Sequence, residues 1–120
     1  MIRLGLVASA GAVIGSLARY GMTLMFPHNN LSTFPWATFL VNIVGALGIG
    51  LIARVSPLME DETKRAFLVT GVLGGFTTFS ALALETVQLL QTNVVLAFVY
   101  ILATFGIGVT ATLLSIRSEV

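Results

Sequence analysis

The sequence of 120 residues contains no cysteine, one histidine and few charged residues, which make up 9% of the chain. Without cysteine, neither disulfides nor thiolate metal sites can form. Five acidic residues and one histidine leave little for acid–base catalysis, and no nucleophile, base and orienting group recur at a catalytic spacing. We therefore expect no enzyme. The lack of a sizeable basic patch also predicts that nucleic acid is not a partner.

Long apolar stretches dominate what the sequence does contain, because 57% of its residues are hydrophobic. A helix needs roughly 20 mostly apolar residues to cross the hydrocarbon core of a bilayer. All three prolines fall between stretches of that length, as expected for helix breakers. The sequence predicts an all-α, single-domain membrane protein over residues 1–120. Its four expected spans are 4–26, 34–53, 66–90 and 94–116.

The segment 71–85 places glycines, hydroxyls and one carboxyl inside an apolar span. Gly71, Gly74 and Gly75 each weaken a helix by about 1 kcal/mol relative to alanine. Irregular backbone at bilayer depth survives only where protein or a water-filled cavity satisfies it. The segment therefore predicts a broken third helix whose carbonyls and hydroxyls meet an ion. The alternative is that small residues here only allow close helix packing.

The first span combines a smooth face with a positive charge. Gly11 and Gly15 have the small-xxx-small spacing that lets helices approach closely. Arg19 follows four residues later on the same side. It either anchors the helix by reaching the membrane interface or attracts anions. His28, in the short polar connection that follows, is interpreted as a solvated loop residue.

The second span carries a polar and small stripe made of Thr38, Asn42 and Gly45. A buried amide in lipid must find partners. The NH2 group of Asn42 could donate to an anion, or the amide could form an interhelical hydrogen bond. The two interpretations stay open at this point.

The third and fourth spans each place polar groups along one side. Thr78, Leu82 and Glu85 share a face of the third span, and Tyr100 and Thr104 share a face of the fourth. An ionisable residue inside a membrane span is a functional candidate by default, because burying it is costly. Glu85 is that candidate.

The basic residues predict how the chain is oriented. With four spans, both termini and the 55–65 loop lie on one side of the membrane, and the turns at 27–33 and 91–93 lie on the other. The first side carries five basic residues and the two turns carry none, so the positive-inside rule predicts that both termini are cytoplasmic. These residues are Arg3, Arg54, Lys64, Arg65 and Arg117.

Three motifs together resemble the Fluc/CrcB family of bacterial fluoride channels. They are Gly-Gly-Phe-Thr-Thr-Phe-Ser at 74–80, Trp-Ala-Thr-Phe-Leu-Val-Asn-Ile-Val-Gly at 36–45, and Gly-Ser-Leu-Ala-Arg-Tyr at 15–20. The similarity extends over all four spans. It implies an antiparallel dimer of four-helix subunits in the bacterial cell membrane. Such a dimer conducts fluoride passively down its gradient and so relieves toxicity.

The resemblance also implies which residues handle ions. A structural sodium ion at the dimer interface would be held by the main-chain carbonyls of Gly74 and Thr77. Fluoride is small and firmly hydrated, so a pore must replace its water with compact donors such as amides, hydroxyls and the positive edge of an aromatic ring. The implied pathway residues are Arg19, Asn42, Thr78, Phe79, Ser80, Leu82, Glu85, Tyr100 and Thr104.

One position departs from the family pattern. Leu82 stands where the family usually has a second pore phenylalanine, and leucine offers no aromatic edge to an anion. The strong charge bias is a second departure, because a self-pairing antiparallel dimer must insert in both orientations. Both features favour one half of a heterodimer over a homodimer.

Two other functions are alternatives to a fluoride channel. A small proton-coupled exporter of toxic cations should carry a membrane carboxylate in its first span, whereas this chain has Arg19 there and Glu85 in the third. A non-conducting membrane assembly subunit remains an alternative because of Leu82.

Overall fold

The structure is a computed structural model that describes residues 2–27, 33–55 and 60–117. Every regular element in these ranges is helical, and His28 lies outside them. The element order is α1 (Ile2–Met25), α2 (Trp36–Arg54), α4 (Glu62–Arg65), the π-helix η1 (Ala66–Leu73), α5 (Gly74–Phe76), α6 (Ser80–Thr92) and α7 (Val94–Arg117).

Four helical segments are long and apolar enough to cross a membrane. They correspond to α1, α2, the run Glu62–Thr92 and α7, so the predicted all-α architecture with four spans is confirmed. The run Glu62–Thr92 contains α4, η1, α5 and α6, and its helical path is interrupted between Phe76 and Ser80. The prediction of a broken third helix is therefore also confirmed.

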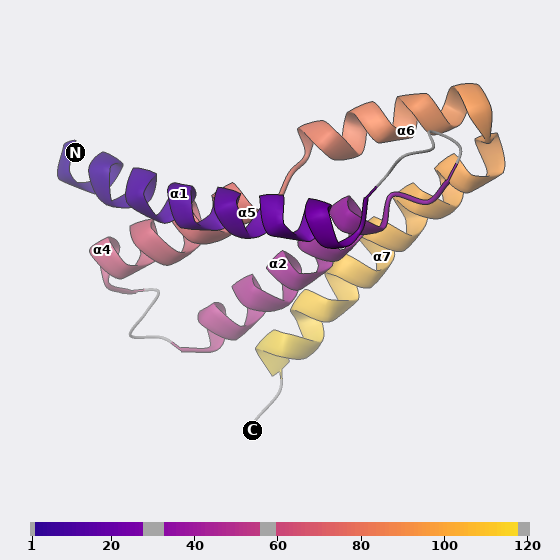
Figure 1. The fold of residues 1–120 in the computed structure, drawn as a ribbon. Helices are drawn as coiled ribbons and strands as arrows, with labels where there is room; N and C mark the ends of the chain where they lie inside the picture. Colours follow the sequence, from indigo (N-terminus) through magenta and orange to yellow (C-terminus); the bar gives the residue numbers. More distant parts are fainter. Residues whose placement is uncertain (1, 28–32, 56–59, 118–120) are drawn as a thin grey trace.

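The helices pack in three pairings (Figure 1). α1 lies along η1 and α5, which form the first half of the third span. α2 runs beside α7. After the break, α6 leaves the line of η1 and α5, and the chain turns back so that α6 pairs with α7.

Where α1 meets the third span, backbone packs directly against backbone. The four glycines at this contact, here called the glycine seam, are Gly11, Gly15, Gly71 and Gly75. A Cβ added to Gly71 would lie 2.5 Å from the Ala8 carbonyl oxygen. One added to Gly75 would lie 2.5 Å from the Ala12 carbonyl oxygen. No side chain fits there, so the small-xxx-small face predicted on the first span has the packing role expected for it.

A side-chain core joins α2, α6 and α7. Its buried members are Phe39, Leu82, Leu89, Ala97 and Tyr100. Phe34 covers this core, with its ring centroid 5.4 Å from that of Tyr100 in an edge-to-face arrangement.

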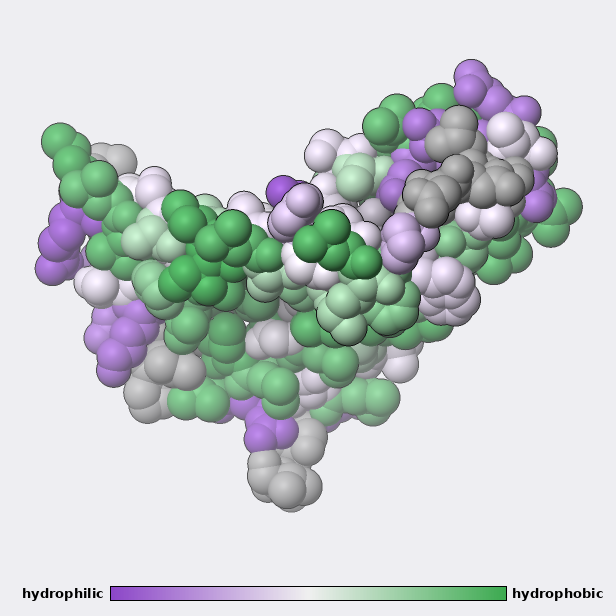
Figure 2. Space-filling model, viewed as in Figure 1, coloured by the Kyte–Doolittle hydropathy of each residue, from purple (hydrophilic) through white to green (hydrophobic). Residues whose placement is uncertain are grey.

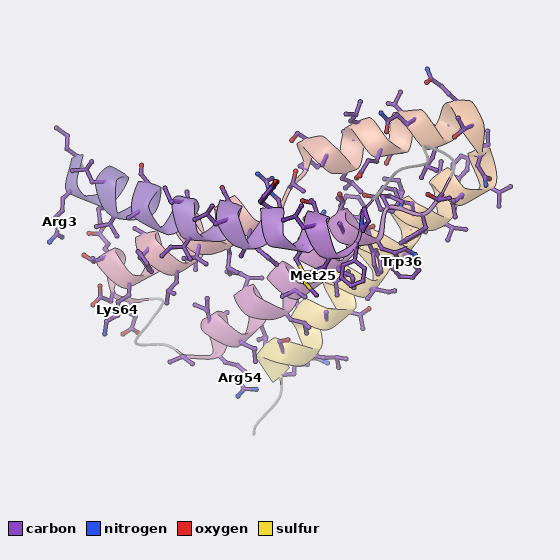
Figure 3. All side chains as sticks on the ribbon, viewed as in Figure 1. Arg3, Met25, Trp36, Arg54 and Lys64 are labelled. Atoms are coloured by element: carbon purple, nitrogen blue, oxygen red, sulfur yellow. The ribbon has the colours of Figure 1, made fainter. Side chains whose placement is uncertain are left out.

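The face seen in Figure 2 is mostly apolar, and most of its hydrophilic residues lie at its left and upper right ends and along its lower edge. Arg3, Lys64 and Arg54 lie toward the left and lower left of the view in Figure 3, and Trp36 lies well to their right. This separation matches the distribution of basic residues that the sequence predicts. Which end faces the cytoplasm is a property of the cell, and it stays a prediction.

Candidate ion pathway at the break of the third span

The break begins where the backbone leaves the helical conformation at Thr77, which has φ −80° and ψ 159°. Both the backbone N–H and the hydroxyl of Thr77 donate to the Leu73 carbonyl oxygen, each at 2.9 Å. Thr78 and Phe79 lie outside the helices, Phe79 already has helical dihedral angles of φ −89° and ψ −35°, and α6 begins at Ser80. The local sequence favours this interruption because glycine and threonine are weak helix formers.

Asn42 of α2 bridges the break. Its Oδ1 accepts from the Thr78 backbone N–H at 2.9 Å, and its Nδ2 donates to the Thr78 carbonyl oxygen at 3.0 Å. Because one residue supplies both the donor and the acceptor, only one orientation of the amide satisfies the pair. Of the two interpretations left open for Asn42, the interhelical hydrogen bond is present. One of its two Nδ2 protons is used, so the amide still has a donor for an anion.

This arrangement redirects two backbone N–H donors of the third span away from their usual main-chain acceptors. In a continuous α-helix, the N–H groups of Thr78 and Ala81 would bond the carbonyls of Gly74 and Thr77. Here the Thr78 N–H donates to Asn42, and the Ala81 N–H donates to the Thr78 hydroxyl at 3.2 Å. The Gly74 and Thr77 carbonyls are therefore available to another partner.

An open groove of about 630 Å³ runs past the break. Its walls come from α2, the third span on both sides of the break, and α7. Seven of the eleven site residues predicted from the sequence line this groove. They are Asn42, Gly74, Thr77, Thr78, Phe79, Leu82 and Thr104.

Thr104 is the most unusual polar group in the groove wall. It is buried, and its hydroxyl oxygen has no hydrogen-bond partner among the described residues. A buried hydroxyl without a partner costs free energy, so such groups call for an explanation in a native structure. The oxygen is almost inaccessible in this single chain, so a ligand would have to displace part of the groove wall to become its partner.

Known proteins similar to this chain agree on one family. The family model described as "CrcB-like protein, Camphor Resistance (CrcB)" matches residues 6–116. Proteins named fluoride-specific ion channel FluC match over most of their length. The chain is 43% identical to the one from Agrobacterium fabrum over 114 residues, which covers 92% of this chain and 90% of that protein. It is 40% identical to one from Thermus thermophilus over 115 residues, covering 93% and 90%.

This chain belongs to the CrcB/FluC family of fluoride-specific ion channels. A third relative, from Flavobacterium psychrophilum, is 43% identical over 110 residues, and the match covers 85% of this chain and 85% of that protein. The resemblance seen in the sequence is thus confirmed. The family consists of channels, which agrees with the expectation that the chain is not an enzyme.

Two nominated residues of this CrcB/FluC chain form a separate polar pair beside the groove. The Tyr100 hydroxyl donates to Glu85 Oε1 at 3.0 Å, which joins α7 to α6. Tyr100 is fully buried, and Thr38 of α2 interacts with the same hydroxyl. The polar stripe predicted on the second span therefore meets the polar faces of the third and fourth.

The other nominated residues occupy contrasting positions. Phe79 is 74% exposed at the edge of the groove, although it is a large apolar ring. Ser80 is exposed, with its hydroxyl 3.4 Å from that of Thr78. Leu82 is only 4% exposed and belongs to the side-chain core as well as the groove wall. Arg19 is half-buried on α1 and is not among the groove residues.

Sequence reasoning missed the role of Gly45. It was placed on the polar stripe, but its contact with the break was not expected. A Cβ built on Gly45 would overlap the Thr77 methyl group. The spacing Asn42 to Gly45 was the available signal, because residues three apart share a helix face.

Proposed function

We propose that this chain is a subunit of a fluoride-specific channel that lets fluoride leave the cell down its gradient. The observation that carries the proposal is the groove at the helix break, where Asn42, Thr78 and Thr104 face one apolar space. Its donors are compact and its walls otherwise apolar, which suits a small anion that must exchange water for fixed hydrogen bonds.

The pathway would use the polar groups in order along the groove. Asn42 offers its second Nδ2–H, and Thr104 offers an O–H that has no other acceptor among the described residues. Phe79 offers the positive edge of its ring. The Tyr100 and Glu85 pair would continue the polar track beyond the groove, and Ser80 would stand near its entrance. Arg19 would act from outside the groove, as a positive charge that draws anions or as an anchor.

A sodium ion is proposed at the break. Sodium prefers oxygen ligands, and the carbonyls of Gly74 and Thr77 have both lost their usual donors, which fits that preference. Both residues line the groove. Among the described residues, no group of three or more histidine, cysteine or acidic side chains could hold a metal, so main-chain oxygens are the candidates. A bound cation there would add positive potential beside an anion path.

The proposed assembly is an antiparallel dimer. The groove is open along one side, and Phe79 stands at its edge with 74% of its surface exposed. A second four-span subunit would cover both. Because the basic residues are biased to one end, we favour a different chain as the partner, with both termini of this chain in the cytoplasm of a bacterial cell.

Fluoride efflux from liposomes tests the proposal. Vesicles loaded with fluoride and reconstituted with the purified chain should release fluoride only when the partner subunit is also present. Robust flux from this chain alone would support the channel and refute the heterodimer. Proton movement driven by a cationic toxin without fluoride flux would indicate an exporter. A stable complex with a second chain and no flux from that complex would indicate an assembly subunit.

A further inference from the structure

Two residues of α2 contact consecutive residues of the break. Asn42 holds both backbone groups of Thr78, as described above. Gly45, three residues later on the same face of α2, is buried beneath the Thr77 side chain. The conformation of the break is therefore held from a neighbouring helix as well as by its own sequence.

The side chain of Thr77 can take only one arrangement at this contact. Threonine is stiff at χ1, and its hydroxyl is fixed by the hydrogen bond to the Leu73 carbonyl. With the hydroxyl fixed, the methyl group points onto Gly45. The methyl fills the space where any other residue at position 45 would have a Cβ.

We propose that Asn42 and Gly45 are positioning residues that together set the break of the third span. Gly45 leaves room for the Thr77 methyl and so fixes where the helix ends. Asn42 then holds the backbone of Thr78 in its non-helical course. Together they determine the direction of the Thr77 carbonyl and the point at which α6 begins. The expected effect on fluoride flux rests on the proposed function, whereas the expected effect on the backbone does not.

The first test is the substitution Gly45→Ala in the full chain. We expect fluoride efflux to fall at least tenfold, and hydrogen exchange of the backbone amides in the peptide spanning 74–81 to become at least tenfold faster. Gly48→Ala is the matched control on the same helix. Its Cβ would meet only the end of the flexible Leu73 side chain, at 3.1 Å, so flux and exchange should stay within twofold of the wild type.

The second test asks whether the methyl group is the cause. Thr77→Ser removes the methyl but keeps the hydroxyl and the main-chain carbonyl. The next atom of Thr77, its Cβ, lies 3.6 Å from the position of a Cβ on residue 45, which is an ordinary contact. The double variant G45A/T77S should therefore return to within threefold of the wild type in both measurements. G45A/T77V keeps a methyl at the same place and should stay impaired.

Each outcome decides the matter. The proposal is overturned if G45A exchanges like the wild type, or if G45A/T77S is no better than G45A. If G45A cannot be purified as a folded protein, recovery of folded G45A/T77S supports the proposal, and failure of both variants overturns it. If the wild type conducts no fluoride by itself, as expected for one half of a heterodimer, the exchange results alone decide the positioning role.

Discussion

The two halves of the third span pack against their neighbouring helices through different kinds of contact. Before the break, η1 and α5 meet α1 through glycines, with carbonyl oxygens and Cα atoms in direct contact. After the break, α6 meets α7 and α2 through large side chains and through the hydrogen bond from Tyr100 to Glu85. Where it faces α1, the first half is a scaffold with no room for a side chain. The second half carries Ser80, Leu82 and Glu85, whose side chains are predicted to line the ion pathway, and its contacts can adjust by changes of rotamer.

The same comparison separates the three glycines of the break. Gly71 and Gly75 face α1, where a Cβ would collide with backbone atoms. Gly74 has only one atom near its Cβ position, the Val69 carbonyl oxygen at 3.6 Å, and it lines the groove. The packing interpretation therefore applies to Gly71 and Gly75, whereas the ion interpretation stays a prediction for Gly74.

The largest effect is expected from filling the glycine seam. In Gly15→Val, the new Cβ would lie 2.8 Å from the Phe76 nitrogen and 2.9 Å from the Val72 carbonyl carbon, and backbone cannot move aside. Overpacking costs about 1–3 kcal/mol or more. We expect no monodisperse protein by size-exclusion chromatography. Gly21→Val on the same helix has no atom within 4 Å of its Cβ and should purify normally. Normal folding of Gly15→Val would show that the seam can open.

The next effect is expected from Asn42→Ala. This change leaves the N–H and C=O of Thr78 without their partners, each at a cost of about 1–3 kcal/mol when buried. Fluoride efflux should fall more than tenfold. Asn42→Asp keeps an acceptor for the Thr78 N–H but, when ionised, has no donor for the Thr78 carbonyl. The flux of Asn42→Asp should lie between those of the wild type and Asn42→Ala. Equal flux from these three proteins would mean that the hydrogen bonds between Asn42 and Thr78 do not affect conduction.

The fold of this chain was accessible from sequence because its signals are local. Span length depends on the run of apolar residues, and the break depends on weak helix formers, so both could be predicted. Helix pairing is not local. Gly71, Gly74 and Gly75 look alike in the sequence, and only the placement of α1 distinguishes them. The contact between Gly45 and Thr77 joins segments more than thirty residues apart, so the spacing of Gly45 from Asn42 could indicate a shared face of α2 but not which residue that face meets.

The candidate site was predicted in part for the same reason. The polar stripes on the second, third and fourth spans could be recognised from helical spacing, and the groove brings many of their members together. Leu82 was interpreted as a pore wall, but it also packs in the core against Tyr100, which depends on how α6 returns along α7. Roles in conduction would depend on the proposed second subunit, about which the sequence of one chain gives no contacts.

A smaller effect is expected from Tyr100→Phe, which tests the polar pair after the break. The ring would still fill the core, and only the hydroxyl that donates to Glu85 would be lost. A hydrogen bond to a charged group contributes about 1.5–3 kcal/mol, and interhelical bonds in membranes average nearer 0.6. We expect a threefold to tenfold loss of fluoride efflux with little change in folding. Tyr20→Phe, on an exposed part of α1, is the control and should conduct normally.

Leu82→Phe probes the departure from the family pattern. The new ring would offer an aromatic edge at the groove, so fluoride flux through this chain should rise about twofold to fivefold. Leu82 is also 4% exposed, so the larger side chain should lower stability by about 1–3 kcal/mol through overpacking. Leu84→Phe, at a residue that is 60% exposed on the same helix, controls for added size. Unchanged flux with lowered stability would assign Leu82 to the core alone.

The smallest effect is expected at the start of the third span, outside both halves of the comparison. Asp61 caps α4, because its Oδ1 accepts from the backbone N–H groups of Thr63 and Lys64 at 3.0 and 3.1 Å. Asp61→Ala should cost about 1 kcal/mol, measured as a small drop in thermal unfolding temperature, with fluoride efflux unchanged. Glu60→Ala removes the neighbouring acid but leaves both of those bonds in place, so its unfolding temperature should not move. A loss of flux in Asp61→Ala alone would mean that the capped end influences the break some fifteen residues away, and that the glycine seam transmits changes along the span instead of holding the scaffold fixed.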